Sequence, residues 1–349
     1  MMKWFRDNID RMAGYVPGEQ PAPGEKVIKL NTNENPYPPS PPAMEVLRSV
    51  DADCLRRYSD PMADVVRQAA GRALGVPSEQ VLVGNGSDDV LAMIFRACCA
   101  PGRRAAYPMP TYVYYRTLAE IQAADCVEVA FDDDYALPAD ALADANGAVT
   151  FVANPNSPSA TFTPVDVLDD LAGRVGGLLV IDEAYVDFAD DCALRLVGKH
   201  ANVIVLRTLS KGYSLAGLRL GFGIMSPALM PNLVKVKDHY NVDAVAAAVG
   251  AAALDDQAWM KANAERVKAS RSRLADDLGR LGFRVWPSQA NFLMARPPDG
   301  EAERIYSGLK ARRILVRYFK QPRLEDKLRV TVGRDEQNAA LVEALGAMA

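Results

Sequence analysis

The chain has 349 residues, of which 49% are hydrophobic and 24% charged, an ordinary composition for a globular protein with one large core and a smaller domain. Its net charge of -4 and its lack of a basic stripe argue against nucleic acid as a main partner, so anionic substrates must be held by local arginines. Five cysteines without metal-type spacing predict reduced thiols and a cytoplasmic protein.

Membrane and metal chemistry are also disfavoured. Residues 1–12 lack the apolar core of a signal peptide, and the longest apolar run, residues 244–254, is too short to cross a bilayer, so we expect no membrane partner. The two histidines, His200 and His239, flank no catalytic motif. We therefore expect no metal site, and acid/base chemistry on lysine and tyrosine side chains.

The first 45 residues form an arm rich in proline and glycine. Because prolines are crowded between Pro36 and Pro42, we expect neither a paired strand nor a helix there. We expect an extended segment that crosses another subunit. A helical pattern follows from Met62 to Leu74. We expect an arm at 1–45 that joins the small domain and a dimer contact, a large cofactor-binding domain at 46–238, and a small C-terminal α+β domain at 239–349.

Short apolar segments alternate with helical stretches from Val81 to about Gly223. This alternation predicts an α/β fold with a mostly parallel, doubly wound sheet. The expected strands are Val81–Val83, Arg104–Tyr107, Cys126–Val129, Ala148–Ala153, Leu178–Asp182, Val203–Arg207 and Gly221–Ile224. Long helical patterns and then short strands follow, as expected for the small domain.

A glycine turn between the first expected strand and a helix is the first candidate for ligand binding. The backbone N–H groups of Gly86, Ser87 and Asp88 would point outward at the helix N-terminus, where the helix dipole favours an anion such as phosphate. The turn lacks the lysine of a Walker A loop and the three spaced glycines of a dinucleotide site. Ser87 as a plain helix cap is the alternative.

The apolar run Leu178–Ile181 ends in Asp182 and Glu183. Such runs are typical of buried parallel strands, and an acid at the carboxyl end lies over the ligand crevice. A buried carboxylate beside a ring nitrogen keeps that nitrogen protonated and makes the ring an electron sink, so Asp182 is our candidate. A helix cap or a solvated loop is the alternative for both acids.

The segment Thr208–Arg219 supplies an amine, a small hydroxyl and a cation. Lys211 follows an expected strand, and the nearby Arg219 favours the neutral, nucleophilic amine. Together with Ser210, these residues form the set that an aldehyde cofactor carrying a phosphate would need. A surface Ser-Lys-Gly turn is the alternative.

Five ordered blocks of this sequence resemble the fold-type I aminotransferases that depend on pyridoxal phosphate (PLP), and more narrowly the histidinol-phosphate aminotransferase family. The resemblance covers nearly the whole chain. The blocks are residues 30–36, 86–88, 182–185, 208–221 and 328–333. It implies that Lys211 binds the PLP aldehyde and moves the substrate proton, and that Asp182 holds the ring nitrogen protonated.

The resemblance also assigns cofactor contacts. Gly86, Ser87, Asp88, Ser210 and Arg219 would neutralise the PLP phosphate. Tyr112 would stack on the ring, while Tyr114 and Tyr115 would serve packing. Tyr185 would donate to the phenolic oxygen, and Tyr58 would reach the phosphate of the neighbouring subunit, so the site would be assembled in a homodimer.

One loop departs from the family pattern. The family carries Asn-Asn-Pro-Thr-Gly where this chain reads Asn154-Pro155-Asn156-Ser157-Pro158-Ser159-Ala160. Ser157 stands at the position of the family's asparagine, so either Ser157 or, after a one-residue shift, Asn156 contacts the phenolic oxygen. Ala160 replaces a glycine that adopts positive φ freely.

For the substrates, the resemblance implies that Arg329 holds the α-carboxylate of glutamate or the phosphate of histidinol phosphate in turn. It places Tyr15, Asn33 and Arg317 near the substrate. The implied reaction converts histidinol phosphate and 2-oxoglutarate to imidazole-acetol phosphate and glutamate in histidine biosynthesis.

The sequence is also compatible with other functions. An aromatic amino-acid aminotransferase or a threonine-phosphate decarboxylase of the same fold would share the cofactor residues. A PLP-binding regulatory or storage protein without turnover is a second class, although the chain has no room for an added DNA-binding domain. A nucleotide binder that uses residues 84–87 is a third.

Overall fold

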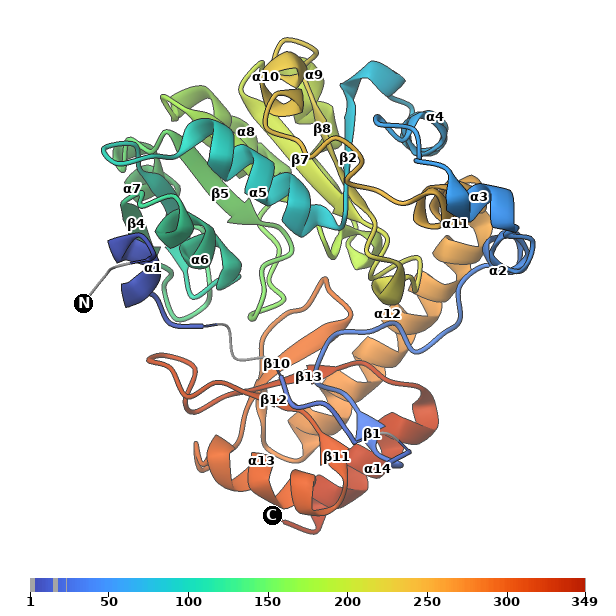
Figure 1. Ribbon diagram of the computed structural model, residues 1–349. Coiled ribbons are helices and arrows are strands. Elements are labelled where there is room, and N and C mark those ends of the chain that lie inside the picture. The colour runs from blue at the N-terminus through green and yellow to red at the C-terminus, as the bar shows by residue number, and fades with distance from the viewer. Residues whose placement is uncertain (1–3, 15–17, 23, 349) are drawn as a thin grey trace.

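The computed structural model describes residues 4–14, 18–22 and 24–348, and Figure 1 shows a large sheet with helices on both faces above a smaller domain. The large sheet has seven strands in the order β2-β8-β7-β6-β5-β3-β4. Only β8 runs antiparallel to its neighbours, which confirms the mostly parallel, doubly wound sheet. The strands are β2 (Val81–Gly84), β3 (Ala105–Met109), β4 (Cys126–Ala130), β5 (Val149–Ala153), β6 (Leu178–Asp182), β7 (Val203–Thr208) and β8 (Gly221–Met225).

Alternate side chains of each central strand enter different cores, because successive residues of a strand point to opposite faces. Val180 and Ile204 pack with α5 and α6 on one face, while Ile181 and Val205 join the core under α4, α8 and α11 on the other. The helices of this domain are α4 (Asp64–Leu74), α5 (Ser87–Cys98), α6 (Tyr114–Ile121), α7 (Ala139–Asp144), α8 (Val165–Arg174), α9 (Leu196–Lys199), α10 (Met230–Val234) and α11 (Ala244–Asp255).

The small domain has a four-stranded antiparallel sheet in the order β12-β13-β10-β9, with helices packed on it. Its strands are β9 (Arg284–Val285), β10 (Phe292–Arg296), β12 (Arg317–Tyr318) and β13 (Leu328–Thr331), and its helices are α12 (Gln257–Arg280), α13 (Ala302–Ala311) and α14 (Asp335–Gly346). Helix α12 links both cores, since Val267 belongs to the large one and Leu274 to the small one. Helix α11 lies in the part of the chain expected to form the small domain, but it packs against α2 and α4 of the large domain. The domain boundary at residues 238 and 239 stays a prediction.

The N-terminal arm is more regular than we expected. Its elements are α1 (Asp7–Arg11), β1 (Ile28–Lys29), α2 (Pro41–Arg48) and α3 (Ala52–Arg56). The exclusion of a helix from the proline-rich stretch is wrong: Pro41 and Pro42 occupy the first turn of α2, where their missing N–H groups would have no partner in the helix, and Ser40 caps it. Strand β1 pairs in parallel with β11 (Ile314–Leu315), and α1 lies beside α6 (Figure 1).

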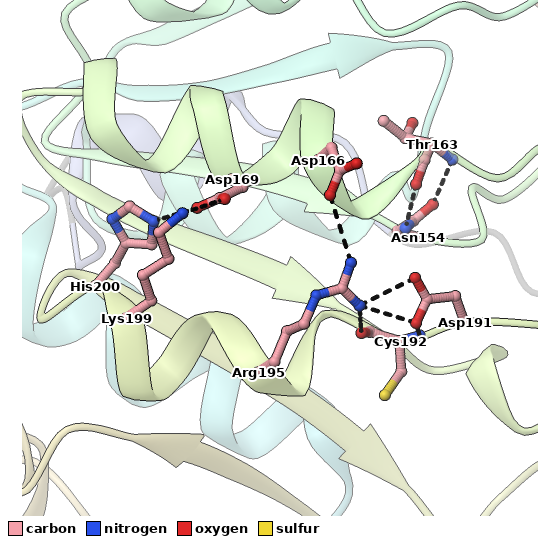
Figure 2. Close-up of polar contacts among 9 residues, drawn as sticks. All are labelled: Asn154, Thr163, Asp166, Asp169, Asp191, Cys192, Arg195, Lys199 and His200. Atoms are coloured by element: carbon pink, nitrogen blue, oxygen red, sulfur yellow. Dashed lines mark hydrogen bonds and ion pairs between the residues drawn. The ribbon is translucent and has the colours of Figure 1, made fainter.

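His200 lies on the outer surface of the large domain, where it forms a polar contact with an acidic residue. Its Nε2 lies 2.5 Å from Oδ1 of Asp169 on α8, and Lys199 binds the same carboxylate (Figure 2). Arg195 pairs with Asp166 and Asp191 nearby. Water and salt screen surface pairs of this kind, so they contribute little to stability.

Candidate active site

The parallel strands bring the predicted motifs to one edge of the large sheet. The turn after β2, the end of β6 and the loop after β7 meet there, because the carboxyl ends of parallel strands share an edge. They surround a cavity of ≈ 630 Å³ that the arm and the small domain close. Its lining includes the predicted residues Asn33, Ser87, Asp88, Tyr112, Asp182, Tyr185, Ser210, Lys211, Arg219, Arg317 and Arg329. A second hollow of ≈ 890 Å³ around Arg271 and Trp286 holds none of them.

One end of the cavity is built for an anion. Helix α5 begins at Ser87, and the Arg219 guanidinium reaches Ser210 Oγ at 3.2 Å and Asp88 Oδ2 at 3.4 Å. Gly86 has a φ of +83°, which strains any other residue, and a Cβ there would lie 2.8 Å from Arg219 Nη2 and displace the guanidinium. Free helix N–H groups and a cation therefore face the same space.

Lys211 lies in the loop after β7 with its amine in the cavity. Its Nζ donates to the carbonyl of Thr32 at 3.3 Å and lies 5.6 Å from the centre of the Tyr185 ring. The loop is held from two sides. Asn35 Nδ2 donates to the carbonyls of Lys211 and Gly212 at 3.0 and 3.2 Å, and the backbone N–H of Gly212 bonds the buried Asp187 carboxylate.

Asp182 ends β6 and is 5% exposed. The Tyr115 hydroxyl donates to its Oδ2 at 2.9 Å, and the backbone N–H of Ala184 donates to Oδ1 at 3.2 Å. Burial raises the pKa of Asp182 to about 6, although both hydrogen bonds favour the ionised form. A carboxylate held this way can pair with a protonated ring nitrogen at neutral pH.

Tyr112 lies near Asp182, with its hydroxyl bonded to Asp88 Oδ1 at 3.0 Å. Its ring meets Tyr115 edge-on, with centroids 5.7 Å apart. Burial raises the pKa of Tyr112 well above the ordinary value, so it stays a neutral wall of the cavity. Tyr115 combines the expected packing role with a polar contact that sequence reasoning missed.

Tyr185 follows β6, and its ring packs edge-on against Phe292 at 5.0 Å. Its hydroxyl accepts a hydrogen bond from Asn33 Nδ2 at 3.0 Å. Asn33 is 1% exposed and has a φ of +57°, a backbone region that asparagine tolerates better than most residues. The predicted substrate residue thus contacts a predicted cofactor residue.

The unusual loop is closed by Asn154, whose side-chain amide exchanges two hydrogen bonds with the backbone of Thr163 (Figure 2). Asn156 turns inward: it accepts from Thr111 Oγ1 at 2.7 Å, donates to Ser159 Oγ at 2.8 Å, and does not line the cavity. Ser157 does line it, and its Oγ accepts from Arg329 Nη1 at 3.3 Å. The Asn156 contact stays a prediction without support here.

Ala160 adopts the conformation expected of the family's glycine, with a φ of +65° in a fully buried position. The left-handed region costs an L-residue about 1–2 kcal/mol. Two backbone hydrogen bonds hold Ala160 in this conformation. Its N–H donates to the Asn156 carbonyl at 2.8 Å, and its carbonyl accepts from the Gln289 N–H. The loop therefore accommodates an alanine at positive φ.

Two arginines form the opposite end of the cavity. Arg317 and Arg329 are directly opposed across β12 and β13, and their guanidinium carbons lie 5.1 and 5.5 Å from the centre of the Phe319 ring. Arg329 Nη2 also donates to the carbonyl of Asn31 at 2.9 Å. Like charges opposed across a sheet repel each other, and an anion between them would relieve that repulsion.

Tyr58 is not brought to the cavity. Tyr58 is 83% exposed and stacks on Tyr240 with centroids 4.5 Å apart, outside the cavity lining. Tyr15 lies outside the described residues. The sequence predicted only a packing role for Tyr115, and it singled out neither Asp187 nor Asn35, although Asn35 lies in the block of residues 30–36.

Residues 25–345 match the family model for class I and II aminotransferases. The chain belongs to this aminotransferase family. It is 58% identical over 345 residues to histidinol-phosphate aminotransferase 1 of a Nostoc species, covering 99% of this chain and 98% of the relative. It is 44% identical over 341 residues to the histidinol-phosphate aminotransferase of Citrifermentans bemidjiense, covering 98% and 97%.

The solved structures include a histidinol-phosphate aminotransferase from Sinorhizobium meliloti in complex with pyridoxal 5'-phosphate. It superposes on this aminotransferase with a TM-score of 0.90 at 25% identity, covering 100% of this chain and 99% of the other. A threonine-phosphate decarboxylase from Porphyromonas gingivalis, 20% identical with a TM-score of 0.81, shares the fold alone. The resemblance seen in the sequence is therefore confirmed.

The cavity of this aminotransferase fits PLP. An anion end, a buried carboxylate, an aromatic wall and a lysine amine correspond to the phosphate, ring nitrogen, ring face and aldehyde of that cofactor. The described part of the chain holds no cluster of three or more His, Cys, Asp or Glu side chains able to bind a metal ion. Within the same residues, no helix has the length and apolarity needed to cross a membrane.

Proposed function

We propose that this protein is a PLP-dependent histidinol-phosphate aminotransferase, which converts L-histidinol phosphate and 2-oxoglutarate to imidazole-acetol phosphate and L-glutamate in histidine biosynthesis. The observation that carries the proposal is one cavity with Lys211 and Asp182 at its centre and opposed Arg317 and Arg329 at one end. Full-length identity of 44–58% to proteins of that activity supports the substrate assignment.

PLP, when bound, supplies an aldehyde for the substrate amine and a ring that accepts the electrons released at the substrate Cα. Lys211 Nζ is the amine in position to bind the aldehyde, and then to take the proton from Cα and return it. Asp182, ionised above about pH 6, keeps the ring nitrogen protonated. Ser87, Ser210 and Arg219 hold the phosphate.

The arginine pair suits a reaction in which two substrates visit one pocket in turn. Arg329 presents a planar guanidinium that binds a carboxylate or a phosphate bidentately. Arg317, opposed to it across the strands, adds the second charge for the doubly negative phosphate. Ser157 touches Arg329 and stands at the position of the family's asparagine, which contacts the phenolic oxygen of the cofactor.

The working unit is a homodimer in which Tyr58 enters the partner's site. Its 83% exposure, beside Tyr240, supports a role completed by a second copy. In Tyr58→Phe, PLP affinity should fall while the fold is kept; unchanged PLP retention would remove the shared site. The five free cysteines agree with the expected cytoplasmic location, which stays a prediction.

The test of the function is the visible absorbance of PLP-loaded protein before and after borohydride, in wild type and Lys211→Ala. We expect wild type to carry PLP covalently after reduction, with the adduct mapped to Lys211 by peptide mass spectrometry. If Lys211→Ala carries as much covalently bound PLP after reduction as wild type does, Lys211 is not the residue that binds the aldehyde.

Substrate choice is tested separately. Amino transfer from histidinol phosphate should exceed transfer from phenylalanine, and threonine phosphate should release no CO2. Faster turnover of phenylalanine would replace our proposal with the aromatic aminotransferase.

A further inference from the structure

Asn33 is hydrogen-bonded at each of its four polar groups, and its partners come from distant parts of the chain. Its backbone N–H donates to Thr331 Oγ1 at 3.0 Å, and its carbonyl accepts from Asn291 Nδ2 at 2.9 Å. Its side-chain oxygen accepts from Thr331 Oγ1 at 3.0 Å, and its Nδ2 donates to the Tyr185 hydroxyl at 3.0 Å. Asn33 and Thr331 are 1% and 3% exposed, so water does not compete for these bonds.

The hydrogen bonds run in one direction through these residues. Thr331 Oγ1 accepts from the Asn33 backbone N–H and donates its own proton to the Asn33 side-chain oxygen. The Asn33 amide NH2 faces Tyr185 and donates to its hydroxyl, so the Tyr185 oxygen is an acceptor on that side.

The consequence concerns the Tyr185 proton. Within the described residues no protein group accepts it, and Tyr185 lines the cavity beside Lys211. We propose that Asn33 and Thr331 are positioning residues that fix the Tyr185 hydroxyl as a donor pointing into the cavity. This inference rests on the proposed function, because the acceptor there is the phenolic oxygen of PLP.

The three residues of this relay belong to different parts of the fold. Asn33 is in the arm, Thr331 ends β13 of the small sheet, and Tyr185 follows β6 of the large sheet. Thr331 is fixed further by its backbone N–H, which donates to the Leu30 carbonyl at 2.9 Å. The direction of the Tyr185 donor is therefore set where the arm, the small domain and the large domain meet.

The test uses the PLP-loaded protein and the pH midpoint of its visible absorbance change. A donor at the phenolic oxygen favours the anionic form of that oxygen, so loss of a fixed donor raises the midpoint. Thr331→Val removes the relay hydroxyl and keeps the shape. Asn33→Gly removes the amide and still adopts the positive φ readily. Each should raise the midpoint by about half a unit to one unit, the size expected for one hydrogen bond.

Three further variants separate this role from a structural one. Thr331→Ser keeps the hydroxyl and should restore the wild-type midpoint. Tyr185→Phe should raise the midpoint, and Thr331→Val should add nothing to it, because the relay acts through Tyr185. Thr150→Val is the matched control: Thr150 is a buried strand threonine away from the cavity, and its midpoint should equal wild type.

The outcomes distinguish the relay from the function. The relay is overturned if Thr331→Val has the wild-type midpoint, or if Thr331→Val shifts the midpoint as much in Tyr185→Phe protein as it does in wild type. Either result leaves the proposed function standing. A wild type that fails to turn over histidinol phosphate, but whose midpoint responds to Thr331→Val only when Tyr185 is present, overturns the substrate and supports the relay.

Discussion

The Tyr115 hydroxyl donates to Oδ2 of Asp182 at 2.9 Å from a position with no solvent exposure. Two opposing effects therefore act on one carboxyl group. Burial raises the pKa of Asp182, and the Tyr115 hydrogen bond is the largest influence that lowers it. Tyr115 thus keeps Asp182 ionised in a place where desolvation alone would favour its protonation.

Tyr115→Phe should raise the pKa of Asp182 further and weaken PLP binding on the acid side of neutrality. We expect the pH below which PLP affinity declines to move up by about one unit, since a hydrogen bond to a charged group is worth roughly that much. Titrations of PLP between pH 5.5 and 8 measure it. Tyr114→Phe, on the same helix without a bond to Asp182, is the control; equal profiles for all three proteins would contradict the prediction.

Asp182→Asn should bind PLP and lose turnover by about 100-fold or more, because a neutral amide cannot hold the ring nitrogen protonated. The measurement is kcat with histidinol phosphate and 2-oxoglutarate, alongside the dissociation constant of PLP. Near-normal turnover in a variant that is saturated with PLP would rule out the electron-sink role of Asp182.

Gly212→Ala should disturb the loop that carries Lys211, because a Cβ there would overlap the Asp187 carboxylate. Overpacking of this kind costs about 1–3 kcal/mol of unfolding free energy, and PLP affinity should fall with it. Gly217→Ala is the matched control in the same segment, since a Cβ there meets nothing within 4 Å. Urea unfolding and PLP titration measure both; equal values for the two variants would contradict the close contact.

Asp187→Asn should change how stability depends on pH. Burial raises the pKa of Asp187 to about 6, against the attraction of Arg207. Between about pH 4 and 6 the folded protein holds a proton that the unfolded chain has lost. This contribution to stability is therefore complete below about pH 4 and lost as the pH rises through about 6.

The variant lacks that titration, so its unfolding free energy relative to wild type should rise by about 2 kcal/mol between pH 4.5 and 7. Urea unfolding of PLP-free protein at both pH values gives the difference. Asp170→Asn, at an exposed carboxylate on α8, is the control variant. A constant difference for Asp187→Asn would mean that this carboxyl titrates alike in both states.

Local patterns in the sequence suffice to predict the fold class and the central groups of the site. Apolar runs such as Leu178–Ile181 are continuous because both faces of the sheet are covered, and the residues that follow them must lie at a common edge. For that reason Asp182 and Lys211 could be brought together without knowledge of any tertiary contact. The glycine turn before Ser87 belongs to the same local pattern.

The packing of the domains selects which side chains touch across that edge. Asn33 meets Thr331 and Tyr185 over separations of 298 and 152 residues, and a strand register pairs Arg317 with Arg329. Loop closure likewise turned Asn156 inward and left Ser157 at the cavity. Local patterns carry the periodicity of strands and helices, whereas such contacts depend on how whole domains pack, because a shift of one residue in register points a side chain to the other face.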